Sequence, residues 1–225
     1  MGFFGTELFD FLEELAHNNT RDWFEANRDR YEADVKEPCL EFIEAMASPL
    51  HEISPHFRAI PRVQGGSMFR IHRDTRFSND KTPYKTNAAL HFRHERAKDA
   101  HAPGYYLHLE PDNCFAGVGL WAPETKVQYA IRAHIDEHRD RWVSAKEALD
   151  GVFTVDPHNP LKRPPKGYDA DDPLIEDLKL RSFIAMTSLD ETTVTSDGFL
   201  PTYVGMIGHA TPFMGFLCDA VGVEF

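Results

Sequence analysis

Apolar residues in the first quarter of the chain recur three and four positions apart, which is the spacing of an amphipathic helix. Between positions 6 and 17, for example, Leu8, Leu12 and Leu15 share one face with two phenylalanines. A pair of asparagines interrupts this pattern, and Thr20 is suited to cap a second helix. The spacing predicts three helices, from Thr6 to about His17, from Thr20 through Tyr31, and from about Pro38 to Ile53.

From Met68 onwards the apolar spacing shortens to two positions, the period of a half-buried β-strand. In segment 105–110 the two alternating faces are Tyr105, Leu107 and Leu109 on one side and Tyr106, His108 and Glu110 on the other. A Glu-Pro-Asp-Asn turn predicts an antiparallel hairpin with the next strand, in which Gly117 and Gly119 leave one face open. The expected strands are Met68–His72, Ala88–Arg93, Tyr105–Glu110, Cys114–Trp121 and Ser182–Leu189.

Helical spacing returns after Pro123 and again near the C-terminus. No Asp, Glu, Lys or Arg occurs between Asp197 and Asp219, but the prolines and glycines there favour buried helices, broken near Pro212, over a membrane span. Helices, then antiparallel strands, then helices predict an α+β fold. We expect a single domain over residues 1–225, with an antiparallel sheet and helices packed at one face and end.

The composition narrows the class of protein without changing this fold. With 42% hydrophobic residues the chain can build a substantial core. Its net charge of −12 argues against general binding of nucleic acids or membrane surfaces, because most of the surface would repel a polyanion. Cys39, Cys114 and Cys218 form no CxxC or Cys/His pattern. We therefore expect reduced thiols, no structural zinc site and a cytoplasmic protein.

One stretch departs from this acidic background, namely residues Ser67–Asn87, called here the basic segment. It carries five Lys or Arg side chains against two acids between Arg70 and Lys85. The cations are Arg70, Arg73, Arg76, Lys81 and Lys85, and the acids are Asp74 and Asp80. A turn at residues 78–81, followed by Pro83, predicts a strand-turn-strand that brings these side chains together.

This grouping predicts a site for a small anion. Arg side chains hold carboxylate or phosphate in a two-pronged manner, and Lys supplies a point charge. Asp74 and Asp80 would orient some of the cations, and Tyr84, beside two lysines, could have a lowered pKa and carry a proton. Tyr84 and Asp74 are thus the candidate catalytic residues. The competing interpretation is that the cations pair with the protein's own 36 acids and only stabilise a loop.

A second basic loop follows inside a proline-rich segment that runs from Asp156 to Pro173. It carries Lys162, Arg163 and Lys166 beside two prolines that stiffen the backbone and lower the entropy cost of holding the cations around a ligand. These three residues could complete the anion site. The alternative is that Tyr168 packs on the core and leaves the basic side chains in solvent.

Three stretches resemble a known family. Residues 69–87, FRIHRDTRFSNDKTPYKTN, are similar to the RI-x-RD-x-RFS-x-DK-x-PYK signature of the mostly bacterial domain of unknown function 2461. Residues 161–173, LKRPPKGYDADDP, resemble its second signature, and the NN-x-x-x-WF pattern at 18–24 resembles its opening. A departure is His72, where the family pattern leads us to expect an aromatic residue such as Tyr. The resemblance implies little about function, because the family is defined by lacking an assigned one.

Other chemistries have little support in the sequence. Residues 72–74 read H-x-D, the start of a two-His-one-carboxylate iron site, but so short a pattern arises easily in a chain with 12 His. An aromatic residue at position 72 in relatives would also exclude a ligand role there. No G-x-S-x-G elbow, P-loop or G-x-G-x-x-G motif occurs. The sequence therefore names no cofactor and no metal.

We expect a cytoplasmic protein that binds a small phosphate- or carboxylate-bearing ligand through the basic segment and could be an enzyme. The alternative is a non-catalytic interaction module that docks an acidic partner or a nucleic-acid end through the same strip. A ligand site needs a concave pocket on which at least three of the cations converge, whereas a docking surface would be flat and exposed. The oligomeric state does not follow from the sequence.

Overall fold

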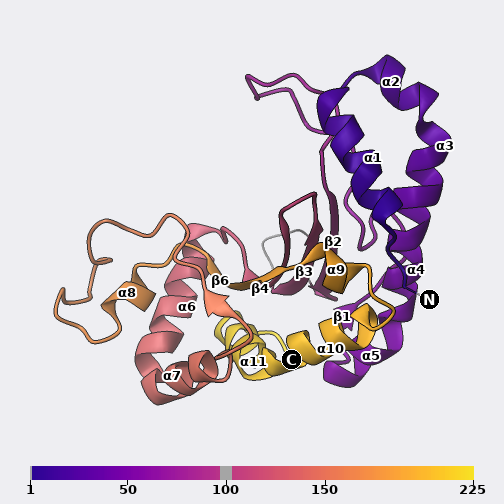
Figure 1. The fold of residues 1–225 in the computed structure, drawn as a ribbon. Helices are drawn as coiled ribbons and strands as arrows, with labels where there is room; N and C mark the ends of the chain where they lie inside the picture. The colour runs from indigo at the N-terminus through magenta and orange to yellow at the C-terminus, as the bar shows by residue number, and fades with distance from the viewer. Residues whose placement is uncertain (1, 97–102) are drawn as a thin grey trace.

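The computed structural model describes residues 2–96 and 103–225. Its centre is a six-stranded antiparallel sheet in the order β1-β2-β3-β4-β6-β5 (Figure 1). The strands are β1 (Phe57–Arg58), β2 (Ala88–His94), β3 (Gly104–Leu109), β4 (Cys114–Leu120), β5 (Thr154–Val155) and β6 (Phe183–Leu189). The register places His91, Tyr106, Gly117 and Met186 opposite one another on successive strands, so they form one row across the sheet.

The helices cover one face and both ends of this sheet. Helices α10 and α11 run along one face, α1 to α5 gather beside β1 and β2, and α6 and α7 lie at the other end (Figure 1). Their bounds are α1 (Thr6–His17), α2 (Arg21–Ala26), α3 (Arg28–Arg30), η1 (Tyr31–Lys36), α4 (Glu37–Ala45), α5 (Ala47–Ile53), α6 (Thr125–Glu137), α7 (Arg139–Glu147), α8 (Ile175–Leu178), α9 (Glu191–Val194), α10 (Phe199–His209) and α11 (Thr211–Ala220).

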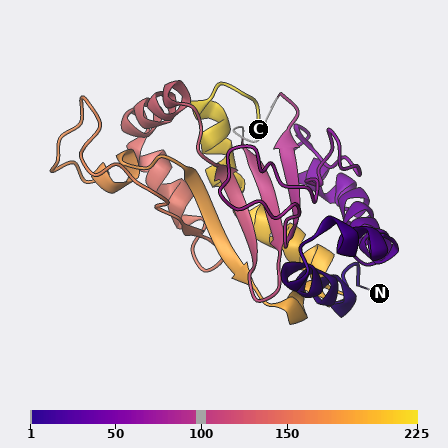
Figure 2. The ribbon, with the colours of Figure 1, turned by 90° about the horizontal axis from the view of Figure 1, so that it is seen from above.

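The two faces of the sheet differ in what covers them. Alternate residues such as Phe92, Leu107 and Ala116 are fully buried and belong to the hydrophobic core, which continues into α10 and α11. Over the opposite face the described chain places no helix above the middle strands, and the basic segment crosses near β2 instead (Figures 1 and 2). We call this second surface the open face. The expected α+β fold with an antiparallel sheet is confirmed.

The N-terminal helices differ from the expectation at Asn27 and Pro38. Helix α2 ends at Ala26, with Asn27 as its C-cap, and α3, η1 and α4 then follow without interruption from residue 28 to 45. Pro38 therefore lies inside a continuous helix rather than at the start of one. Proline lacks an N–H donor and its ring crowds the preceding turn, so the wider π-helical turns of η1, directly before it, accommodate the proline.

Two predictions about the strands need correction. Met68–His72 is not a strand, because residues 67–69 pair only briefly with β2 and the chain then pairs with itself. The two bridges concerned are Met68 with Leu90 and His72 with Tyr84. The second bridge, with the amide of Lys85 donating to Ile71, closes the strand-turn-strand on itself. The short strands β1 and β5 were not expected, since two residues are too few to show a period.

The C-terminal region contains the break expected near Pro212. Helix α10 ends at His209 and α11 starts at Thr211, with the proline in its first turn, where a missing N–H is tolerated. Among the described residues, none of the helices has both the length and the apolar character needed to cross a bilayer.

Candidate functional site

Tyr84 and Asn19 hold the basic segment against the N-terminal helices. Tyr84 is buried and stacks on Phe24 of α2 with the ring centroids 4.1 Å apart. The side-chain amide of Asn19 donates to the Tyr84 carbonyl and accepts from the Tyr84 backbone N–H, both at 3.0 Å. Burial raises the pKa of Tyr84 and the charge of Glu25 raises it further, so the expectation of a lowered pKa is wrong. The cations that act on the phenol are Arg21 and Arg28 rather than a lysine, and Tyr84 acts as an anchor.

The two acids of the basic segment each hold one of its arginines. Arg76 binds Asp74 through Nε to Oδ1 at 2.9 Å and Nη2 to Oδ2 at 2.7 Å. Arg73 donates to Asp80 and to the hydroxyl of Thr82. Hydrogen bonds from Arg76 lower the pKa of Asp74 to about 2, and those from Thr82 and Arg73 lower the pKa of Asp80 to about 2. Internal carboxylates therefore already neutralise these two cations.

A polar hollow of about 660 Å³ lies between the basic segment and α2. Of the five cations, Arg73 and Lys81 line it, with Arg21 and Glu25 from the helix side. Lys81 Nζ donates to the carbonyl of Thr75 at 2.9 Å. An anion entering this hollow would meet Arg21, Arg73 with its carboxylate partner, Lys81 with its backbone partner, and Glu25. Two of the five cations of the basic segment therefore line the hollow, one fewer than the three expected of a ligand site, and Arg21 of α2 adds a cation that the expectation did not include.

The second basic loop does not join the first. It leaves the sheet at the β5–β6 edge, whereas the basic segment leaves at the β2 side, and the two extend apart in both views (Figures 1 and 2). Lys162, Arg163 and Lys166 are exposed, and in the described part of the chain none of them forms an ion pair. Tyr168 packs against the core, as the alternative interpretation of this loop expected.

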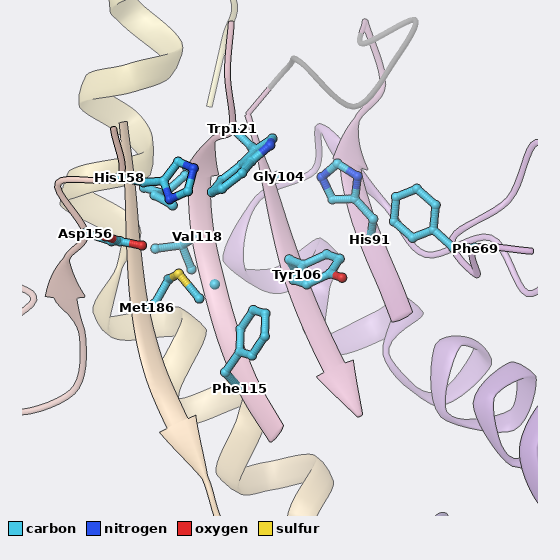
Figure 3. Close-up of a pocket in the computed structure, with 13 residues that line it drawn as sticks. Phe69, His91, Gly104, Tyr106, Phe115, Val118, Trp121, Asp156, His158 and Met186 are labelled. Atoms are coloured by element: carbon cyan, nitrogen blue, oxygen red, sulfur yellow. The ribbon is translucent and has the colours of Figure 1, made fainter. Parts of the chain in front are cut away.

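A cavity of about 440 Å³ opens on the open face of the sheet (Figure 3). Its floor is the cross-strand row of His91, Tyr106, Gly117 and Met186, and the ring of Phe115 borders it. Most of this lining is aromatic or apolar. The missing side chain at position 117 leaves room above the sheet, as the sequence predicted for this face, since a Cβ there would find its nearest neighbours only at 3.8 Å.

The sides of this cavity come from segments that are distant in sequence. Phe69 of the basic segment borders it beside β2, and Trp121 with His158 borders it on the far side (Figure 3). The rings of Trp121 and His158 lie 4.5 Å apart. Asp156 and His158 belong to the start of the proline-rich segment. The first signature stretch, through Phe69, and the start of the proline-rich segment, just before the second signature, therefore border the same cavity from opposite sides.

Two cations, Lys85 and Arg93, lie against the Phe69 ring that lines the cavity. Lys85 Nζ lies 5.1 Å from the centroid of the Phe69 ring, and Cζ of Arg93, on β2, lies 5.8 Å from it. Within residues 2–96 and 103–225 neither forms an ion pair, and Nε of Arg93 is buried without a hydrogen-bond partner. Burial lowers the pKa of Lys85, and the charge of Arg70 lowers it further. Positive charge is thus concentrated where the described chain does not neutralise it.

His91 adds an unpaired polar atom to the lining. Its side chain is 7% exposed, lies parallel to the Phe69 ring with centroids 6.0 Å apart, and has a buried Nδ1 without a hydrogen-bond partner. Burial, and then the charge of Arg93, lowers the pKa of His91 to about 4, so the ring is neutral near pH 7. A Cβ on Gly104 would lie 2.3 Å from His91 Nε2, so the glycine makes room for the ring.

A hydrogen-bonded chain runs along the same side of β3 into the turn after it. Tyr106 Oη lies 3.1 Å from His108 Nδ1, and His108 Nε2 lies 3.2 Å from Glu110 Oε2. Glu110 also accepts from the Thr86 hydroxyl at 3.0 Å and from the Asn113 amide at 2.7 Å. Burial opposes ionisation of Glu110, but these hydrogen bonds outweigh it and keep its pKa below the usual value. Glu110 is therefore a carboxylate near pH 7.

The described parts of the chain contain no metal site of the usual kind. No group of three or more His, Cys, Asp or Glu side chains is placed to hold an ion there. The imidazole of His72, first residue of the H-x-D pattern, instead lies 5.1 Å from the ring of Tyr84 and 6.3 Å from that of Phe24.

Sequence reasoning missed Arg93 and His91, although it placed Tyr106, His108 and Glu110 together on one face. The signal for the last three was the alternation in segment 105–110, because polar residues at every second position of a strand share a side. The alternation in segment 88–93 likewise puts His91 and Arg93 on one face, opposite Leu90 and Phe92, but it does not show which cross-strand neighbours they meet.

Comparison with known proteins identifies the family of this chain but assigns it no function. A search of the curated proteins found no match, and neither did a search of the solved structures. A family model described as "Conserved hypothetical protein (DUF2461)" matches residues 7–216, which include the three stretches whose resemblance was noted in the sequence. The chain therefore belongs to the family Conserved hypothetical protein (DUF2461).

Proposed function

We propose that this protein binds a small anionic ligand with a planar apolar part in the open-face cavity. The observation that carries the proposal is the pair of cations, Lys85 and Arg93, beside an aromatic cavity and without carboxylate partners in the described chain. Nε of Arg93 and Nδ1 of His91 also lack hydrogen-bond partners, but the protein covers both atoms, so the proposal rests on the two cations and not on these atoms.

The size and lining of the cavity favour a small organic anion over a bare inorganic ion. A volume of about 440 Å³ lies in the range of small-molecule sites, and such sites combine apolar walls with a few polar groups that orient the ligand. Phe69, Phe115 and Tyr106 would stack on a planar group. Carboxylate or phosphate would lie near Lys85 and the guanidinium of Arg93, where a two-pronged contact can form.

The other charged residues of the basic segment then have supporting roles. Arg70 is exposed and close enough to Lys85 to lower its pKa, so it would strengthen the attraction of an anion. Asp74 and Asp80, with their arginine partners, hold the shape of the loop that carries Lys85 and Phe69. Within this proposal the anion site lies at the C-terminal end of the basic segment rather than at its centre.

Calorimetric titration with benzoate and phenyl phosphate tests the proposal. Lys85→Gln and Arg93→Gln should each weaken binding about tenfold or more, because a hydrogen bond to a charged group contributes about 1.5–3 kcal/mol. Lys166→Gln, the same change in an exposed cation of the distant loop, is the matched control and should bind like the wild type. The proposal is wrong if neither probe binds the wild type, or if the control loses as much affinity as the Lys85 and Arg93 variants.

One observation favours a second candidate function, the docking of an acidic protein partner. Phe77, at the turn of the basic segment, is 93% exposed, and the guanidinium carbon of Arg76 lies 5.7 Å from its ring. Exposed aromatic residues beside arginine are typical of interaction hot spots. Titration with a poly-glutamate peptide separates the two functions. Docking predicts binding that Phe77→Ser weakens and Lys85→Gln leaves unchanged, and the absence of binding by the wild type would exclude it.

A further inference from the structure

In the hydrogen-bonded series Tyr106–His108–Glu110, the protonation states determine which group donates and which accepts in each bond. Because Glu110 is a carboxylate, it can only accept, so His108 presents Nε2–H to it at 3.2 Å. Burial lowers the pKa of His108 although Glu110 opposes this, so the imidazole is neutral near pH 7 and its Nδ1 carries a lone pair. That lone pair accepts the O–H of Tyr106 at 3.1 Å.

These donor and acceptor roles determine what Tyr106 offers to the cavity. Its own proton is directed along the strand to His108, so the lone pairs of Oη remain as acceptors for another group. Tyr106 lines the cavity, and its Oη points toward β2 and Phe69, the side on which Lys85 and Arg93 lie (Figure 3). Burial and the charge of Glu110 raise the pKa of Tyr106 to about 12, which keeps it from ionising by itself.

We propose that Tyr106 is a hydrogen-bond and proton acceptor for a hydroxyl group of the ligand in the open-face cavity, with His108 as the group that takes the proton of Tyr106 and Glu110 as the positioning residue. This inference rests on the proposed function and narrows its ligand to a planar acid that carries a hydroxyl, such as a hydroxylated aromatic carboxylate. The acid group is held by Lys85 and Arg93, and the hydroxyl donates to Tyr106 Oη.

The same arrangement can move a proton without any further reactant. The ligand O–H bond breaks as its proton passes to Tyr106 Oη, while the proton of Tyr106 passes to His108 Nδ1. The products are a ligand oxyanion beside the Tyr106 hydroxyl and an imidazolium beside the Glu110 carboxylate, so charge is conserved and no electrons are exchanged. Thr86 and Asn113 fix Glu110 in place for this role. A general base oriented by a carboxylate is a recurring device in proton-transfer catalysis.

Paired probes test this inference separately from the proposed function. The wild type should bind 3- or 4-hydroxybenzoate about tenfold more tightly than benzoate, the effect expected for one additional buried hydrogen bond. 4-Methoxybenzoate, which has the oxygen but cannot donate, should show no such gain. Tyr106→Phe should abolish the preference, so that the variant binds the hydroxylated probe and benzoate with equal affinity. Binding of benzoate without any preference would overturn the inference and leave the proposed function standing, whereas absence of all binding would overturn both.

A measurement on the unliganded wild type tests directly which atoms donate and which accept in the hydrogen bonds of His108. The ¹⁵N chemical shifts of the His108 ring should show Nε2 protonated and Nδ1 unprotonated at pH 7, and Glu110→Gln should alter this tautomer. A purely structural hydrogen bond between Tyr106 and His108 requires neither outcome. Protonation at Nδ1 instead would direct the Tyr106 hydroxyl away from His108 and make it a donor to the ligand, which would overturn the assignment.

Discussion

At the residue scale, the role of a charged side chain in this protein depends on the partner it has. Arg73 and Arg76 lie within the same signature as Lys85, yet carboxylates hold the two arginines, whereas the lysine lies against an aromatic ring and has no ion pair among the described residues. The paired residues shape the loop. In the proposed site Lys85 attracts the ligand, and Phe69, which contacts both Lys85 and Arg93, links the two cations to the cavity.

The pairing of Asp80 predicts a strongly acidic carboxyl. Its pKa should be about 2 when measured by NMR, because the backbone N–H of Thr82 and then the guanidinium of Arg73 stabilise the carboxylate. In Arg73→Ala the pKa of Asp80 should rise but stay below its usual value, since the larger contribution from Thr82 remains. Asp74 should be unchanged in that variant. An ordinary value for Asp80 in the wild type would contradict the pairing.

Two glycines of the open face should respond in opposite ways to the addition of a methyl group. Gly104→Ala should lower the free energy of unfolding by about 1–3 kcal/mol, because the new Cβ would lie 2.3 Å from His91 Nε2 and force the ring to move. Gly117→Ala should be neutral or slightly stabilising, since its nearest atoms are 3.8 Å away. Urea denaturation measures both. Equal stability of the two variants would show that His91 does not occupy the space above Gly104.

At the scale of elements, the opening motif of the chain and the basic segment are parts of one structure. Asn19, in the turn before α2, hydrogen-bonds both backbone groups of Tyr84, and Phe24 of α2 stacks on its ring. The end of the basic segment is thereby held one residue before Lys85. The N-terminal helices thus position the cation of the proposed site without lining the open-face cavity themselves.

Removing this clamp should loosen the basic segment. Asn19→Ala leaves the Tyr84 N–H and C=O without their partners, so the free energy of unfolding should fall by about 1–3 kcal/mol. Hydrogen exchange of the Lys85 amide, which donates to Ile71, should become faster. Asn18→Ala, which removes only an exposed bond to the carbonyl of Glu14, is the control and should have a smaller effect. Equal effects of the two changes would refute the clamp.

At the scale of the whole molecule, the spacing of apolar residues predicts the sheet and the helices that cover it, but it does not predict the cavity. The α+β class and the four long strands follow from spacing, because each has a buried face and a less buried one. The sequence does not predict the continuous helix through Pro38, because proline is typical of the first turn of a helix and therefore indicates a start there. The cavity joins Phe69, Tyr106 and His158, whose proximity depends on strand order and register. Counting charges in the basic segment could not show which of them would be neutralised internally.

Buried histidines should make the whole protein less stable in weak acid. The pKa of His91 is lowered to about 4, and burial also lowers those of His94 and His108. Unfolding releases these rings into water, where they bind protons below about pH 6.5, so the unfolded state takes up more protons than the folded state. Stability is therefore fully present above pH 6.5 and falls as the pH drops toward 4, by up to about 1.4 kcal/mol per pH unit for each proton.

Urea denaturation at pH 7 and pH 5 measures this loss, and His91→Gln should reduce it because one of the titrating rings is removed. Stability that stayed constant or rose on acidification would contradict the burial of these histidines in neutral form.

The open-face cavity is the proposed anion site, built around Lys85, Arg93 and Phe69. The most direct measurement is a crystal structure of the protein grown with benzoate. We predict that the ring lies in the cavity against Phe69 and Tyr106, with the carboxylate within hydrogen-bond distance of Lys85 Nζ or the Arg93 guanidinium. An empty cavity, with benzoate bound instead in the polar hollow beside Arg73 and Lys81, would contradict the account.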